Sequence, residues 1–270
     1  MTAHNVSLLP WTADFKIDHA ARTIHLADTS KGSSPGPSLS KSLAQVVNAA
    51  LESRIFPQLS NSHSEEYHLL GANHPVTLER FPSPLFGIAS RGAHMTAYVG
   101  AGPSLKVWVA QRSRHIYTYP GKLDTSVAGG VKASDTALDC IVAEADEEAS
   151  LDTSFVREHV VPTGMISYLS RNVKNDTYQP VVLYVFDLQV PSDMPLKPHD
   201  DEVEAFHLMS VREVFDAMLE WRFKPNCCLV MIDFFVRHGV ITEENEPDYL
   251  ELLTRLRRPL PVPLAPSRDA

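Results

Sequence analysis

Apolar and polar positions alternate along two parts of the chain, and this pattern predicts β-strands in both. Near the start, Phe15 to Leu26 alternates in two short pieces and predicts a hairpin or short strands. In the central part, the pattern predicts five further strands, over 94–100, 106–113, 123–131, 160–169 and 179–190. The polar stretch 170–176 predicts a turn between the last two of them.

Helical spacing of apolar residues follows loop-forming or capping residues at several places. Residues 29–37 are rich in Ser, Gly and Pro, and behind them Ser38 is the predicted N-cap of a helix. A second helix is predicted from Ser134 as N-cap to about Ala149. Three more are predicted over 211–221, 226–238 and 249–257. Strands in the centre and helices around them predict an α+β chain, built as an α/β sandwich with a mixed sheet.

The domain organisation follows from changes in the predicted secondary structure and composition along the 270 residues. We predict a small α+β N-terminal domain over 1–84, a main domain over 85–258 and a Pro-rich tail over 259–270. No apolar run approaches the roughly 20 residues of a membrane-spanning helix. The first ten residues lack the features of a secretory signal. We therefore expect a cytoplasmic protein without a membrane partner.

Charge and cysteine content limit the function classes. A formal net charge of −9 disfavours nucleic acid as a partner, and an anionic substrate would need local cations to bind. The three cysteines, Cys140, Cys227 and Cys228, are an odd number without CxxC spacing, so we expect reduced thiols. The twelve histidines show no HxxxH or HExxH spacing and indicate neither a zinc site nor a catalytic triad.

The second predicted helix concentrates acidic residues on one face. At about 100° per residue, Glu144, Glu147 and Glu148 fall within one arc of roughly 100°. Leu138, Val142, Ala145 and Ala149 form a separate apolar stripe that can pack on a sheet. Like charges at this spacing repel. The two interpretations are a solvated acidic face or a site for a hard divalent cation, and the preceding Ala-Gly-Gly turn favours the second.

This stretch resembles the Nudix box, G-x5-E-x7-R-E-U-x-E-E-x-G-U, in which U is aliphatic. Gly129 matches its first glycine, the three glutamates match those of its helix, and Leu151 matches its last position. The sequence departs from the box at four positions: Asp135 for Glu, Ala143 for Arg, Ala145 for a larger aliphatic residue and Ser150 for Gly. Because the arginine braces the glutamates in that family, Ala143 is the departure that bears most on activity.

The flanking sequence resembles the fungal and plant Nudix hydrolases related to thiamine pyrophosphokinase, in which serine is usual at the position of Ser150. The similar strings include FGIASRGAHMTAYVG, WVAQRS, YPGKLDTSVAGG and FKPNCCLVMIDFFVRHGVIT. The resemblance covers about residues 8–261. It implies a Nudix α/β/α sandwich and hydrolysis of thiamine diphosphate, or of its oxidised or analogue forms, to the monophosphate and phosphate.

The chemistry of the residues agrees with the resemblance and indicates a set of site residues. Mg²⁺, or Mn²⁺ in its place, is expected on Glu144, Glu147 and Glu148, with the Gly129 region as a further ligand and Glu202 as a candidate. Glu144 or Glu148 is expected to act as the base or to orient it. The candidates for binding phosphate are Arg112, Arg114 and Lys122, although each of them alone is more typical of an ordinary surface residue. The candidate for binding a ring is Tyr119, for which a core position is equally compatible.

Two other functions remain open at this point. The first is a Nudix hydrolase of another small-molecule diphosphate, either a nucleotide derivative or a prenyl diphosphate. The second is a catalytically weak Nudix module that only binds a diphosphate, which Ala143 favours and the three glutamates disfavour. The oligomeric state is not predicted.

Overall fold

The computed structural model describes residues 1–56, 59, 65–172 and 177–267. Part of the turn predicted over 170–176, and the end of the tail predicted over 259–270, lie outside these ranges. Within them, no helix has the length and apolar character needed to cross a membrane.

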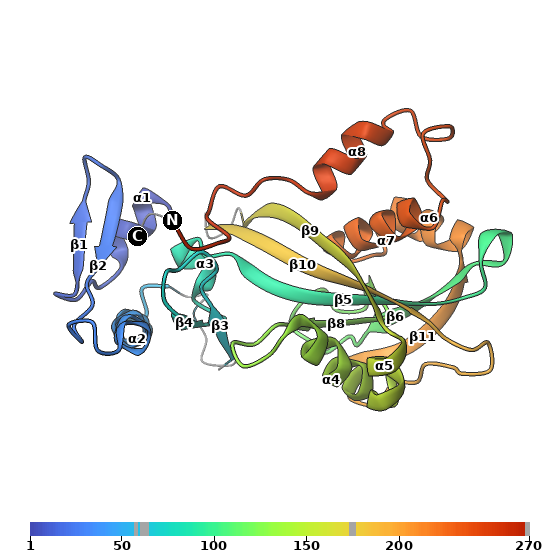
Figure 1. Ribbon diagram of the computed structural model, residues 1–270, viewed down its shortest axis with the longest axis horizontal. Helices are drawn as coiled ribbons and strands as arrows, with labels where there is room; N and C mark the ends of the chain where they lie inside the picture. The colour runs from blue at the N-terminus through green and yellow to red at the C-terminus, as the bar shows by residue number, and fades with distance from the viewer. Residues whose placement is uncertain (57–58, 60–64, 173–176, 268–270) are drawn as a thin grey trace.

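A seven-stranded mixed sheet forms the centre of the molecule (Figure 1). Its strands are β5 (Ser90–Val99), β6 (Lys106–Arg112), β7 (Leu123–Asp124), β8 (Val127–Gly130), β9 (Val161–Asn172), β10 (Thr177–Gln189) and β11 (Val203–Ser210). The order is β11-β6-β5-β10-β9, with β7 paired to β6 and β8 paired to β5. Only β5 and β10 run parallel, and all other pairs are antiparallel.

Helices cover both faces of this sheet (Figure 1). One face carries α4 (Ala137–Ala149) and α5 (Thr153–His159), which pack on Ala93, Met95 and Ala97 of β5. The opposite face carries α6 (Val211–Leu219) and α7 (Pro225–Arg237), and α8 (Tyr249–Leu256) lies beside β9. Successive residues of a strand point to opposite faces. The predicted α+β fold, with a mixed sheet in an α/β/α sandwich, is therefore confirmed.

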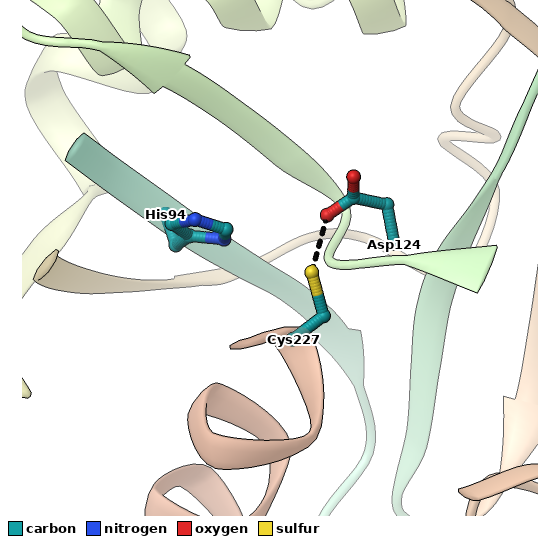
Figure 2. A group of neighbouring side chains, drawn as sticks. All are labelled: His94, Asp124 and Cys227. Atoms are coloured by element: carbon teal, nitrogen blue, oxygen red, sulfur yellow. Dashed lines mark hydrogen bonds between the residues drawn. The ribbon is translucent and has the colours of Figure 1, made fainter. Parts of the chain in front are cut away.

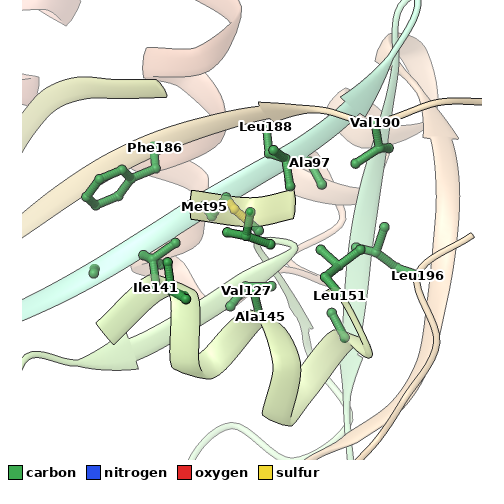
Figure 3. Packing of buried hydrophobic residues seen from close by; sticks show 14 of the residues in the cluster. Met95, Ala97, Val127, Ile141, Ala145, Leu151, Phe186, Leu188, Val190 and Leu196 are labelled. Atoms are coloured by element: carbon green, nitrogen blue, oxygen red, sulfur yellow. The ribbon is translucent and has the colours of Figure 1, made fainter. Parts of the chain in front are cut away.

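The packing of α4 fixes which of its faces meets the sheet. Figure 3 shows Ile141 and Ala145 directed at Met95 and Val127, in a core with no exposure at any of these four side chains. The predicted apolar stripe is confirmed, because Val142, Ala145 and Ala149 are buried and Leu138 is partly buried. This orientation leaves the acidic arc of α4 at the edge of the core, beside β8.

The predicted start of α4 at Ser134 is wrong by two residues. Thr136 is the N-cap, and its hydroxyl accepts a hydrogen bond from the backbone N–H of Asp139 at 3.1 Å. In return, the Asp139 carboxylate accepts a hydrogen bond from the backbone N–H of Thr136 at 3.4 Å. This reciprocal capping box needs an acidic or amide residue three positions after the cap, and a cap at Ser134 would place Ala137 there. The predicted end at Ala149 is confirmed.

The N-terminal residues form a smaller unit with cores of their own. Its elements are α1 (Ala3–Leu8), β1 (Phe15–Asp18), β2 (Thr23–Leu26), α2 (Pro35–Ser53), β3 (Glu66–His68), β4 (Thr77–Glu79) and α3 (Ser83–Phe86). The predicted hairpin is confirmed by the pairing of β1 with β2. The predicted N-cap Ser38 is wrong, because α2 begins at Pro35, a residue suited to the first helical turn. Two apolar clusters of this unit lie within residues 8–88, while the 84/85 boundary stays a prediction.

The C-terminal segment returns along the sheet to the N-terminal unit (Figure 1). The Ser167 hydroxyl of β9 donates to the carbonyl of Arg258 at 2.7 Å, and the backbone N–H of Ser267 donates to Oδ1 of Asn73 at 3.0 Å. A Cβ on Gly71 would lie 2.5 Å from the Pro263 carbonyl oxygen, so only glycine fits this contact. The described part of the Pro-rich tail is thus held against both parts of the protein.

Candidate active site

Helix α4 and strand β8 bring the predicted glutamates against the glycine pair. Glu148 is only 6% exposed, and its carboxylate accepts a hydrogen bond from the backbone N–H of Ala128 at 3.0 Å. A Cβ on Gly129 would fall 2.1 Å from Oε1 of Glu144. Gly129 therefore provides the space in which the Glu144 carboxylate lies. Glu147 is exposed on the same arc of the helix.

Burial and mutual repulsion disfavour the charged forms of two of these glutamates. Burial raises the pKa of Glu144 to about 7, with further contributions from Glu147 and Glu202. Burial also raises the pKa of Glu148 well above its usual range, and the neighbouring Glu144 adds to this. Crowded carboxylates of this kind are stabilised in the ionised form by a bound cation. The oxygen donors on this arc suit a hard divalent ion such as Mg²⁺ or Mn²⁺.

These pKa values give an expected pH dependence for metal binding. As the pH falls below about 7, Glu144 takes up a proton that a cation must displace, so metal affinity falls. We expect the apparent Kd for Mg²⁺ to rise by about tenfold for each pH unit below 7 if one proton is displaced. Calorimetric titration at pH 6 and pH 8, in buffers of different ionisation enthalpy, measures both the Kd and the protons released. Equal affinities without proton release would contradict this coupling.

Glu202 is brought towards α4 by the segment that precedes β11. The backbone N–H groups of Lys197 and Asp200 donate to the carbonyls of Ala149 and Glu147 at 3.2 and 3.1 Å. These bonds cap the C-terminal end of α4 and carry the chain past the acidic arc. The negative charge of Glu202 raises the pKa of both Glu144 and Glu148, which places it in their electrostatic neighbourhood. Its role as a metal ligand stays a prediction.

The four predicted substrate-binding residues have other partners or positions. Arg112 donates to Oδ2 of Asp124 at 3.1 Å and, through Nε and Nη2, to Thr118. Nζ of Lys122 donates to the Trp221 carbonyl, Arg114 pairs with Glu204 at 3.6 Å, and Tyr119 is 47% exposed. None of the interactions found among the described residues joins these four to the glutamates of α4. Their contact with substrate stays a prediction.

Two basic residues that sequence analysis did not single out lie closer to the acidic arc. Nζ of Lys132 lies 3.6 Å from Oε1 of Glu65, and Nη1 of Arg80 lies 3.3 Å from Oε2 of the same carboxylate. A Cβ on Gly130 would fall 2.1 Å from the hydroxyl oxygen of Tyr67 and 3.5 Å from Nη1 of Arg80. Lys132 follows the glycine pair by two residues, which is a usable sequence signal. The others belong to the N-terminal unit, which no local pattern connects with this site.

A separate group of potential metal ligands, His94, Asp124 and Cys227, lies buried between β5, β7 and α7 (Figure 2). The Cys227 thiol donates to Oδ1 of Asp124 at 2.7 Å, and burial raises the pKa of this thiol well above its usual range. Oδ2 of Asp124 already meets Lys224 at 3.2 Å in addition to Arg112. With two cations on one carboxylate and a protonated thiol, these residues form a neutralised hydrogen-bond network rather than a cation site.

The central part of the chain is similar to a known protein domain. Residues 94–226 match the NUDIX domain. They include β8, α4 and the three glutamates, so this part of the chain is similar to the NUDIX domain.

The related proteins extend the match beyond that domain. An uncharacterized protein of Saccharomyces cerevisiae, YJR142W, is 41% identical over 70% of this chain and 58% of its own length. Nudix hydrolase 20, chloroplastic, of Arabidopsis thaliana is 36% identical over 80% of this chain and 57% of its own. The chain thus spans a little over half the length of these relatives. The crystal structure of DR0079 from Deinococcus radiodurans aligns with a TM-score of 0.40 and 16% identity, covering 63% of this chain and 83% of that one.

Proposed function

We propose that this chain is a Nudix hydrolase that uses a divalent metal to cleave the phosphoric anhydride bond of a small-molecule diphosphate. The observation that carries the proposal is the placement of three glutamates on one arc of α4. One of them, Glu148, is buried and held by the backbone of β8, and all three lie within the matched NUDIX domain. A surface acidic patch would have no need to bury a carboxylate beside a glycine that makes room for its neighbour.

The residues of the site have two tasks, which are to hold the metal ion and to accept a proton. Glu144, Glu147 and Glu148 would hold Mg²⁺, or Mn²⁺ in its place, with Glu202 and the Gly129 carbonyl as further ligands. When bound, the ion supplies positive charge that offsets the negative charge of the diphosphate oxygens. A water oxygen forms the new bond to phosphorus, the anhydride P–O bond breaks, and Glu144 or Glu148 accepts the proton of the water. The products are a monophosphate and phosphate.

For the substrate we propose thiamine diphosphate or one of its oxidised or analogue forms. The support is the resemblance of the sequence on both sides of the box to Nudix hydrolases related to thiamine pyrophosphokinase. Tyr119 is exposed and available to stack on a ring, and Arg114 is an exposed cation in the same loop region. These features support a particular leaving group, because the three glutamates act on the diphosphate and do not select the group attached to it.

The test is phosphate release in the presence of Mg²⁺ from a panel of diphosphates. The panel contains thiamine diphosphate, its oxo and oxy analogues, nucleoside diphosphate sugars and prenyl diphosphates. We expect the highest kcat/KM for a thiamine-type compound. A preference for a nucleotide or prenyl compound would support the proposed diphosphatase activity but contradict the proposed substrate. Tight binding of a diphosphate without turnover would instead favour a binding module, a role consistent with Ala143, since α4 carries no basic residue to brace its glutamates.

A further inference from the structure

We propose that Arg80 and Lys132 bind the phosphate oxygens of the substrate, so that the N-terminal unit forms one wall of the active site. In the structure, the Glu65 carboxylate pairs with both cations. This inference rests on the proposed function and adds to it the residues that bind the diphosphate. It also assigns a role to the N-terminal unit.

The position of the two cations follows from contacts between the N-terminal unit and the β8–α4 connection. The backbone N–H of Ala133 donates to the Glu66 carbonyl at 2.7 Å, which fixes the start of β3 against this connection. Tyr67, the next residue, is 4% exposed, and its hydroxyl oxygen occupies the space that a side chain at Gly130 would fill. The guanidinium of Arg80 lies over the Tyr67 ring, 5.9 Å from its centroid. Arg80 is thereby held beside the second glycine of the pair.

The charges around Glu65 show that Lys132 belongs to the electrostatics of the site, and Arg80 shares the carboxylate of Glu65 with it. The neighbours that raise the pKa of Lys132 are Glu65 first, and then Glu144, Asp135 and Glu147. Lys132 and Glu65 in turn influence the pKa of Glu144. The side chains of Arg80 and Lys132 are about half exposed, at 48% and 47%, and the Glu65 carboxylate is 34% exposed. They can therefore exchange Glu65 for a phosphate group without unfolding either part of the protein.

The exchange is favourable for a simple electrostatic reason. A diphosphate carries more negative charge than one carboxylate and offers several acceptor oxygens, and arginine binds such oxygens bidentately. The protein as a whole is acidic, with a formal net charge of −9, so an anionic substrate needs cations at the site itself. Two of the three cations expected from sequence, Arg112 and Lys122, are already bound to Asp124 and to the Trp221 carbonyl.

The test uses the full chain and magnesium methylenediphosphonate, a diphosphate probe whose P–C–P linkage is not hydrolysed. Its Kd is measured by calorimetry for the wild type, Arg80→Ala, Glu65→Gln and the control Arg212→Ala. Arg212 is a surface arginine on α6 that pairs with Asp216 and lies outside the site. We expect Arg80→Ala to weaken binding by about tenfold or more, Glu65→Gln to strengthen it, and Arg212→Ala to leave it unchanged. KM for the hydrolysed substrate should follow the same order.

The opposite signs separate this proposal from a structural role for the same residues. A variant that merely disturbs the N-terminal unit cannot bind the probe more tightly, so stronger binding by Glu65→Gln supports the release of the two cations. Hydrolysis by the wild type together with unchanged binding by Arg80→Ala, or weaker binding by Glu65→Gln, would overturn this inference alone. A wild-type protein that neither binds the probe nor hydrolyses any diphosphate would overturn the proposed function and this inference with it.

Discussion

Replacing Glu148 by glutamine is expected to reduce kcat by about a thousandfold or more while the protein stays folded. The Glu148 carboxylate is buried, accepts a hydrogen bond from the backbone N–H of Ala128, and lies beside Glu144. The amide oxygen of glutamine can accept the same hydrogen bond, so the local structure of β8 is retained. The variant lacks the negative charge that the proposed metal site requires. Phosphate release at saturating substrate, together with the unfolding temperature, measures both effects.

Asp146→Asn is the matched control for this experiment, since it makes the same chemical change two residues earlier on α4. Asp146 is exposed and lies outside the arc of the three glutamates. We expect it to keep wild-type activity. An undiminished kcat in Glu148→Gln would contradict the assignment of the metal site to α4. Equal losses of kcat in both variants would indicate a general effect of charge.

Replacing Asp124 by alanine is expected to lower the free energy of unfolding by about 3–5 kcal/mol. Asp124 is 4% exposed and accepts hydrogen bonds from Arg112 and Lys224. It also accepts one from the Cys227 thiol (Figure 2). Burial alone would raise the pKa of its carboxyl, but Lys224 and Arg112 hold that pKa well below its usual range. The alanine variant would leave both cations without their common partner, and Lys224 is itself largely buried. Urea unfolding gives the difference in free energy.

A surface ion pair provides the control. Asp216 meets Arg212 at 2.9 Å on α6, where both side chains are solvent-exposed to a large extent. Asp216→Ala should cost less than about 1 kcal/mol. An Asp124→Ala variant as stable as Asp216→Ala would mean that the buried network adds nothing to stability.

Sequence patterns predicted the fold where local signals and burial agree. The apolar runs of β9 and β10 are long, and the stripe of α4 repeats at helical spacing, so both were predictable. Helix α5 was not predicted, because it has only seven residues and its apolar spacing is too short to recognise. Its N-cap is Asp152, whose side chain accepts a hydrogen bond from the backbone N–H of Phe155. Strand β11 follows a Pro-rich loop and has an irregular register near Val203, which obscures its alternation.

Only the part of the candidate site that lies on one helix and its preceding turn was predictable from the sequence. Glu144, Glu147 and Glu148 share an arc by helical geometry, and the structure adds that only Glu148 is deeply buried. Arg80 and Tyr67 reach the same place through pairing of β3 with β4 and contact with Gly130, which lies 50 positions after Arg80 (130 − 80) and 63 after Tyr67 (130 − 67). Long-range contacts of this kind have no periodicity in the sequence, so local patterns do not predict them.

The contact between the C-terminal segment and the N-terminal unit has a consequence for the order of events during synthesis. The hydrogen bond from Ser267 to Asn73 joins positions 194 residues apart. Chains generally fold from the N-terminus as they leave the ribosome, and a loop of this size carries a large closure entropy. The residues around Gly71 therefore receive their packing partner Pro263 only after a further 192 residues have been made (263 − 71). Until then, the nascent N-terminal unit is less stable than it is in the finished protein.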